Sequence, residues 1–232
     1  MVFSIAPDVF EVLPSLCVGL VVAEEVHTDI QHLPAVDTLL DEVVADAEKR
    51  LVGMHASDDP RIKPYREAFH ALSMSPSRYP SSNLALLKRI AKGKGLWRVN
   101  PIVDLGNAIS IAYALPLGAH AVDKSDVLEL RFSHNDDTFV ALGEQEVDPT
   151  LAPGELVYAV GTKVQTRRWT WRQSECGKVD AGASRILFPL DGFIGCNDGV
   201  VRQACYELAS YLHKYFGAQT EVYLLDATCP CI

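Results

Sequence analysis

The chain has 232 residues, of which 48% are hydrophobic and 22% charged, and its formal net charge is −9 at pH 7. This length and composition are typical of a folded domain and exclude a disordered chain. The longest apolar runs, such as Leu13 to Ala23, are too short for a membrane span, and the first residues do not resemble a targeting peptide. We therefore expect a cytoplasmic protein that forms one domain, residues 1–232, with no membrane partner.

The N-terminal half is predicted to be rich in helix. Val9 to Val22 mixes β-branched and apolar residues and is expected to form a strand, while Val36 to Val52 has the period of an amphipathic helix. Shorter helices are expected near Ile62 to Ala71 and over Asn83 to Ala91. The proline- and serine-rich segment 75–82 between them is predicted to be a loop, and it is the only candidate internal boundary.

The segment from Arg98 to Asp123 places polar groups inside an apolar helical pattern. Asp104 and Asn107 lie one helical turn apart and therefore share a face. A buried carboxylate or amide needs a partner, so these residues either cap neighbouring loops or contact a ligand. Pro116 is expected to end the helix, and Gly118 then allows a close backbone approach.

From Asp126 onward the pattern changes to strands separated by turn signals. One mixed sheet system is expected to contain five strands: 127–132, 138–142, 156–160, 168–172 and 185–190. A last helix is predicted near Gly199 to Phe216, followed by a β-forming run from Glu221 to Leu225. The six cysteines show no paired CxxC spacing, and Cys229-Pro230-Cys231 lacks the further ligands of a closed site, so we expect no metal and no cofactor.

The basic residues are unevenly distributed along this acidic chain. Between residues 60 and 103 the only acidic residue is Glu67. The candidate phosphate-binding residues of this segment are Lys88, Arg89, Lys92, Lys94 and Arg98. A second basic cluster comprises Lys163, Arg167, Arg168 and Arg172. Either these residues contact a nucleic acid, in which case binding should be weak, transient and sensitive to salt, or they form a solvated face that balances the acidic N-terminal part.

Several segments, in order along the chain, resemble the B3/B4 domain, which is the editing domain of the bacterial phenylalanyl-tRNA synthetase beta subunit, and especially its freestanding relatives. The similar segments are Asn100 to Asn107, Pro116 to Asp123, Leu128 to Gly143, Gly154 to Tyr158 and Arg168 to Gln173. The resemblance covers about residues 80–216, after an N-terminal elaboration over residues 1–79. It implies an α+β fold with layered β/β/α architecture and a pocket that hydrolyses the ester of a mischarged aminoacyl-tRNA.

The chain departs from the synthetase pattern at two functional positions. Gly118 stands where the synthetase has a histidine, and His120 falls at a position that is aromatic in the family. The synthetase glutamate at the end of a late strand has no counterpart within residues 186–190, and Asp191 lies just beyond them. We expect Asn107 and the backbone near Gly118 to act as hydrogen-bond donors, with His120 or Asp191 as the proton acceptor. The alternative for His120 is a packed core imidazole.

Substrate contacts are expected from Asp104, Trp169, Trp171 and Arg172. On a strand, Trp169 and Trp171 would face the same side and either stack on the terminal adenosine or belong to the core. Arg172 and Gln173 would face opposite sides, and Arg172 is the favoured clamp for a phosphate or carboxylate.

The preferred function is trans-editing hydrolysis of a mischarged aminoacyl-tRNA that carries a non-cognate or non-protein amino acid. One freestanding relative clears the arginine analogue canavanine from arginine tRNA, so canavanyl-tRNA is a candidate substrate. The expected partner is an aminoacyl-tRNA, and an aminoacyl-tRNA synthetase is a second candidate. Two alternatives remain open: a non-catalytic module that binds tRNA or an amino acid, and a hydrolase of free amino-acid derivatives.

Overall fold

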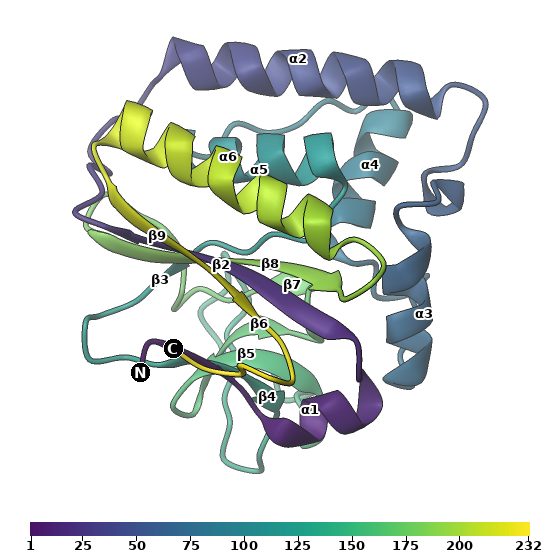
Figure 1. Ribbon diagram of the computed structural model, residues 1–232, viewed down its shortest axis with the longest axis vertical. Helices are drawn as coiled ribbons and strands as arrows, with labels where there is room; N and C mark the ends of the chain where they lie inside the picture. Colours follow the sequence, from purple (N-terminus) through teal and green to yellow (C-terminus); the bar gives the residue numbers. More distant parts are fainter.

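The computed structural model describes residues 1–232, which form two β-sheets and six α-helices in stacked layers (Figure 1). The helices are α1 (Pro7–Val12), α2 (Pro34–Leu51), α3 (Lys63–Ala71), α4 (Ser82–Ala91), α5 (Pro101–Tyr113) and α6 (Asp198–Phe216), with a short 3-10 helix, η1, at Ala56–Asp58. None of these helices combines the length and apolar character needed to cross a bilayer.

The central layer is a four-stranded antiparallel sheet with strand order β3-β8-β2-β9. Its strands are β2 (Leu16–Glu24), β3 (His120–Ala121), β8 (Arg185–Phe193) and β9 (Gln219–Leu225). Almost every residue of β2 and β8 is buried, which explains why these strands read as continuous apolar runs rather than as alternating patterns. Such burial requires a layer on each face of the sheet.

The second sheet has the order β1-β4-β5-β6-β7. Its strands are β1 (Phe3–Ile5), β4 (Leu128–Phe132), β5 (Leu156–Val160), β6 (Lys163–Arg167) and β7 (Arg172–Gln173). Only the β1–β4 pair is parallel. Figure 1 shows this sheet on one side of the central sheet, with α1 beside β4, and helices α2, α5 and α6 on the other side. The predicted α+β class with β/β/α layers is confirmed, whereas the prediction of a single mixed sheet system is wrong.

Helix α6 packs closely against the central sheet because two glycines leave room for it. A Cβ added at Gly19 would lie 2.5 Å from side-chain atoms of Val201 and Cys205, and one at Gly192 would lie 2.4 Å from Val201. Since real Cβ atoms do not approach this closely, both positions need glycine to keep the helix at this distance. Helix α5 lies beside α6, and α2 covers α5 on the outer side (Figure 1).

Three predicted strands differ in the structure. Residues 9–12 belong to α1, which Pro7 starts at its first position, so the strand begins only at Leu16. Residues 138–142 form isolated bridges at Thr138 and Ala141 instead of a strand. Residues 168–171 form a turn between β6 and β7. Strands β1 and β2 come from the segment expected as an N-terminal elaboration, yet they pair with strands from later in the chain.

Candidate active site

A cavity of about 340 Å³ lies where α5, the edge strand β3 and the five-stranded sheet meet. Its lining includes six of the predicted site residues: Asn107, Gly118, His120, Trp169, Trp171 and Asp191. At its floor, His120, Trp169 and Asp191 are buried. At its rim, Val99 and Leu142 are 62% and 50% exposed. The cavity is therefore a pocket with a closed floor and an open mouth.

Helix α5 forms one wall of this pocket. Asn100 caps the helix by accepting a hydrogen bond from the Val103 N–H at 2.9 Å, and Pro101 occupies the first helical position. Gly106 allows the Leu117 side chain to pack closely against α5, since a Cβ at position 106 would lie 3.1 Å from that side chain. The Asn107 side chain lines the cavity and makes no hydrogen bond within the protein, so its amide is free for a ligand.

Asp191, near the end of β8, provides a buried carboxylate at the floor. Its Oδ1 accepts hydrogen bonds from the Tyr158 hydroxyl and from Trp169 Nε1, each at 2.7 Å. Oδ2 has no protein donor. Burial raises the pKa of Asp191 to about 7, and the two hydrogen bonds oppose this rise by stabilising the charged form. Asp191 can therefore be either protonated or ionised near neutral pH.

His120 is fully buried and packs against Tyr158, which also bonds to Asp191. The two ring centroids lie 5.7 Å apart. Both ring nitrogens lack a hydrogen-bond partner in the protein, although the residue lines the pocket. Burial lowers the pKa of His120 to about 4, so the imidazole is neutral at pH 7 and carries one donor and one acceptor. Buried polar atoms are seldom left unpaired, which points to a polar ligand or water at this ring.

Gly118 makes room for the His120 ring. A Cβ at position 118 would lie 2.7 Å from His120 Nε2 and 3.4 Å from the ring of Pro189. The backbone N–H of Gly118 donates to the Pro189 carbonyl at 3.0 Å, so it is not available to a ligand. The next amide, that of Ala119, lines the pocket and has no acceptor in the protein. The free backbone donor expected near Gly118 is therefore Ala119.

The turn at 168–171 places two tryptophans at the pocket in an unusual backbone conformation. Arg168 and Trp169 have positive φ angles of 51° and 61°, which cost about 1–3 kcal/mol each for side-chain-bearing residues. The Trp169 N–H donates to the Leu156 carbonyl at 2.5 Å, and its indole bonds to Asp191. Trp169 lies at the floor and Trp171 nearer the surface. The tertiary contacts of Trp169 thus hold a turn where β-propensity alone predicts a strand.

Residues 64–217 match the B3/4 domain family. The chain belongs to this family. Among solved structures, an N-terminal fragment of the phenylalanyl-tRNA synthetase beta subunit from Pyrococcus horikoshii is similar at a TM-score of 0.44 and 8% identity, over 94% of this chain and 50% of that one. The chain thus spans about half the length of that fragment. No curated protein matches.

Two expected substrate-binding residues of this B3/4 domain lie outside the pocket lining. Asp104 is buried and accepts a hydrogen bond from the Val99 N–H at 3.1 Å, so it holds the segment before α5 in place. Burial raises the pKa of Asp104. Arg172 points away from the pocket and pairs with Glu144 at 2.9 Å, whereas Gln173, on the other side of β7, lines the cavity. The two residues face opposite sides of β7 as predicted, but Gln173 faces the pocket instead of Arg172.

Among the lining residues that were not predicted to act at the site, Tyr158, Thr170 and Gln173 carry polar groups inside the pocket. Tyr158 connects His120 and Asp191, and the Thr170 hydroxyl is buried without a partner. Gln173 Nε2 donates to the Ala119 and Gly177 carbonyls at 3.3 Å and so positions the β3 edge. Tyr158 carried a signal in the sequence, since a tyrosine within a buried strand needs a partner for its hydroxyl.

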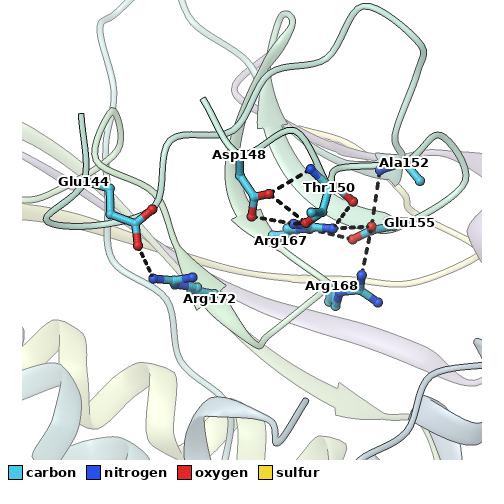
Figure 2. A network of polar contacts seen from close by, with 8 residues as sticks. All are labelled: Glu144, Asp148, Thr150, Ala152, Glu155, Arg167, Arg168 and Arg172. Atoms are coloured by element: carbon cyan, nitrogen blue, oxygen red, sulfur yellow. Dashed lines mark hydrogen bonds and ion pairs between the residues drawn. The ribbon is translucent and has the colours of Figure 1, made fainter. Parts of the chain in front are cut away.

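The two basic clusters of the B3/4 domain differ in their partners. In the second cluster, Arg167 is 1% exposed and bonds to Asp148, Thr150 and Glu155, Arg168 also reaches Glu155, and Arg172 binds Glu144 (Figure 2). These arginines are neutralised within the fold, so the interpretation of this cluster as a phosphate-binding surface is wrong for them.

In the first cluster, Arg98 pairs with Asp37 and Asp41 of α2, as expected for charge balance within the fold. Arg89 stacks on Trp97, with its guanidinium 3.5 Å from a ring centroid. Lys88, Lys92 and Lys94 form no ion pair. These three lysines are the candidate tRNA-binding residues that remain free.

One group of potential metal ligands lies away from the pocket. The ligand atoms of His134, Asp136 and Asp137 lie within 4.8 Å of one another. Asp137 already accepts two hydrogen bonds from Arg131, at 2.7 and 2.9 Å, and one from the His134 N–H. Burial raises the pKa of Asp137, but its hydrogen bonds from Arg131 and the His134 N–H outweigh burial and lower it. This carboxylate is therefore already paired within the turn that follows β4.

Proposed function

We propose that this B3/4 domain hydrolyses the ester bond of a mischarged aminoacyl-tRNA and acts in trans. The observation that carries the proposal is the combination, in one closed-floor pocket, of a buried carboxylate with a free oxygen and several uncommitted donors. An aminoacyl ester is already activated, so its hydrolysis requires a positioned water and a stabilised oxyanion but no covalent nucleophile. The site residues supply these functions.

Asp191 is the proton acceptor in this proposal. Its Oδ1 is fixed by Tyr158 and Trp169, which leaves Oδ2 to accept a proton from water as the water oxygen bonds to the ester carbon. A general base works best with a pKa near the working pH, and that of Asp191 is about 7. When the carbon–oxygen bond to the ribose breaks, the proton passes to the ribose oxygen and regenerates the carboxylate.

The oxyanion is stabilised by Asn107 Nδ2 and the Ala119 N–H. Both donors line the pocket and neither has an acceptor within the protein. They come from α5 and from Ala119, the residue before β3, whose carbonyl accepts a hydrogen bond from Gln173 and whose neighbour Gly118 donates to Pro189. Donors held in this way need no reorganisation during the reaction. Neutral His120 packs behind Gly118 and against Tyr158 and so shapes the floor of the pocket.

The terminal adenosine stacks at the pocket mouth in this proposal. Trp171 lines the cavity and contacts Tyr79 edge to face, with ring centroids 4.9 Å apart. The Arg168 guanidinium lies 3.9 Å from the Tyr79 ring centroid, which fixes this aromatic pair. Base–aromatic stacking contributes about 1–3 kcal/mol per base and tolerates any base.

The experiment is a deacylation panel with the full chain. Mischarged tRNAs, including canavanyl-tRNA, are incubated with the protein alongside matching 3′-aminoacyl-adenosines and simple amino-acid esters, and the released amino acid is measured. We expect turnover of at least one mischarged tRNA, with a kcat/KM well above that of the simple ester. Binding of tRNA without turnover would instead identify a binding module, and turnover of simple esters alone would identify a hydrolase of free derivatives.

A further inference from the structure

A second concave surface lies between η1, α3, the loop at residues 75–81 and α4. It consists of two adjoining hollows of about 230 and 320 Å³ that share Ser57 and Lys88. We call it the α3–α4 groove. Its polar side chains include Arg66 and His70 from α3, Ser75 and Ser77 from the loop, and Lys88 and Lys92 from α4.

The groove keeps its positive charge. Arg66, Lys88 and Lys92 have no carboxylate within 4.0 Å. The only acidic residue between positions 60 and 103 is Glu67, which Lys63 binds at 3.6 Å. Asp58 of η1 accepts a hydrogen bond from the Ser57 hydroxyl at 3.4 Å, and Asp59 is buried and pairs with Arg50 and Arg61. This differs from the arginines of Figure 2, each of which faces an acid.

The donors of the groove suit phosphate oxygens. Arg66 Nη1 is anchored to the Ser57 carbonyl at 3.0 Å, which leaves the rest of its guanidinium free. Lys88 makes no hydrogen bond within the protein, and the Ser75 and Ser77 hydroxyls lie 2.9 Å apart. A guanidinium, an ammonium and hydroxyl groups are the usual contacts of phosphate backbones and carry no base specificity.

Helix α4 connects the groove to the active-site pocket. Ser82, its first residue, lines the pocket, and Lys88 lies about 9 Å further along the helix axis. The helix start is fixed, because the Ser82 N–H donates to the Thr170 carbonyl at 2.8 Å and Asn83 Nδ2 donates to the Ala114 carbonyl at 2.7 Å. A chain that enters the pocket can therefore reach the groove along one rigid element.

We propose that the α3–α4 groove binds backbone phosphates of the RNA whose 3′ end enters the pocket. The identity of this RNA as a tRNA rests on the proposed function. The groove would supply sequence-independent affinity, and the pocket would select the ester. On a chain with a net charge of −9, a small basic footprint predicts weak binding that falls with salt by about one unit of log–log slope for each phosphate contacted.

The test is a salt titration of uncharged tRNA binding, because it needs no turnover. Lys88→Gln and Lys92→Gln remove charges that hold no other part of the fold, and each should reduce the slope of log Kobs against log salt by about one. The double variant should bind about 10-fold more weakly at low salt. Lys214→Gln, at the far end of α6 from α3 and α4 (Figure 1), should bind as the wild type does.

The outcomes separate this proposal from the proposed function. The groove proposal would be overturned if the double variant bound tRNA with the affinity and salt slope of the wild type. It would also be overturned if the wild type did not bind tRNA. If the double variant binds tRNA more weakly but the wild type deacylates no substrate, the result would support phosphate binding by the groove and refute the proposed hydrolase function. If both proposals hold, hydrolysis of 3′-aminoacyl-adenosine, which lacks the RNA body, should be unchanged in the double variant.

Discussion

Asp191 is the residue on which the proposed chemistry depends. Its Oδ1 accepts two hydrogen bonds within the protein, whereas its Oδ2 accepts none. Replacement by Asn keeps an acceptor for Tyr158 and Trp169 but removes the proton acceptor. We expect Asp191→Asn to lower kcat by about 100-fold or more, as loss of a general base does. The measurement is single-turnover deacylation at saturating enzyme. Activity within a fewfold of wild type would contradict the assignment.

The pH dependence follows from the same carboxylate. The base must be ionised, and its pKa in the folded protein is about 7. The value of kcat/KM should therefore rise tenfold per pH unit below this value and level off above it. Trp169→Phe removes a hydrogen bond that lowers this pKa, so the midpoint of the profile should move to higher pH. Trp171→Phe, which has no bond to Asp191, is the control and should leave the midpoint unchanged.

Gly118 shows how one small residue determines the position of a histidine. Gly118→Ala would place its Cβ 2.7 Å from His120 Nε2, so the ring must move. We expect a loss of about 1–3 kcal/mol in the free energy of unfolding, typical of overpacking, together with reduced kcat/KM. Gly199→Ala is the matched control because nothing lies within 4 Å of its added Cβ. Equal stability and activity of the two variants would contradict this account.

At the scale of elements, the arginine network of Figure 2 fixes the long connection between β4 and β5. Arg167 is almost completely buried, and Arg167→Met would leave Asp148 and Glu155 without their main partner. We expect destabilisation of about 3–5 kcal/mol, measured by urea unfolding. Arg172→Met removes an exposed pair and should cost no more than about 1 kcal/mol. Similar losses in the two variants would show that the network has no special role.

The elements that could be predicted from sequence are those with local causes. The helices near 36–52, 83–91 and 199–216 follow from their apolar period, and the strand at 156–160 follows from its β-branched content and turn signals. The turn at 168–171 could not be predicted, because its conformation depends on bonds from Trp169 to residues of β5 and β8. Local propensity there favours a strand, and tertiary contacts prevail.

At the scale of the whole molecule, the residues around the pocket could be predicted in outline, but the ion-pair partners of the basic residues could not. Asn107, His120 and Asp191 do lie around one cavity although they are far apart in the chain. Arg98 and Arg172 were expected to face ligands, yet each binds a carboxylate more than 25 residues away, at Asp41 and Glu144. No spacing rule reveals such pairs, since they depend on how layers pack.

The central claim is that this pocket hydrolyses aminoacyl esters on tRNA with Asp191 as the base. Its most direct test follows the loss of labelled amino acid from a panel of mischarged tRNAs, with wild-type protein and Asp191→Asn at pH 6 and pH 8. We predict that the wild type deacylates at least one mischarged tRNA and does so faster at pH 8, and that the variant is nearly inactive at both. No deacylation by the wild type, or equal rates in the two proteins, would contradict the account.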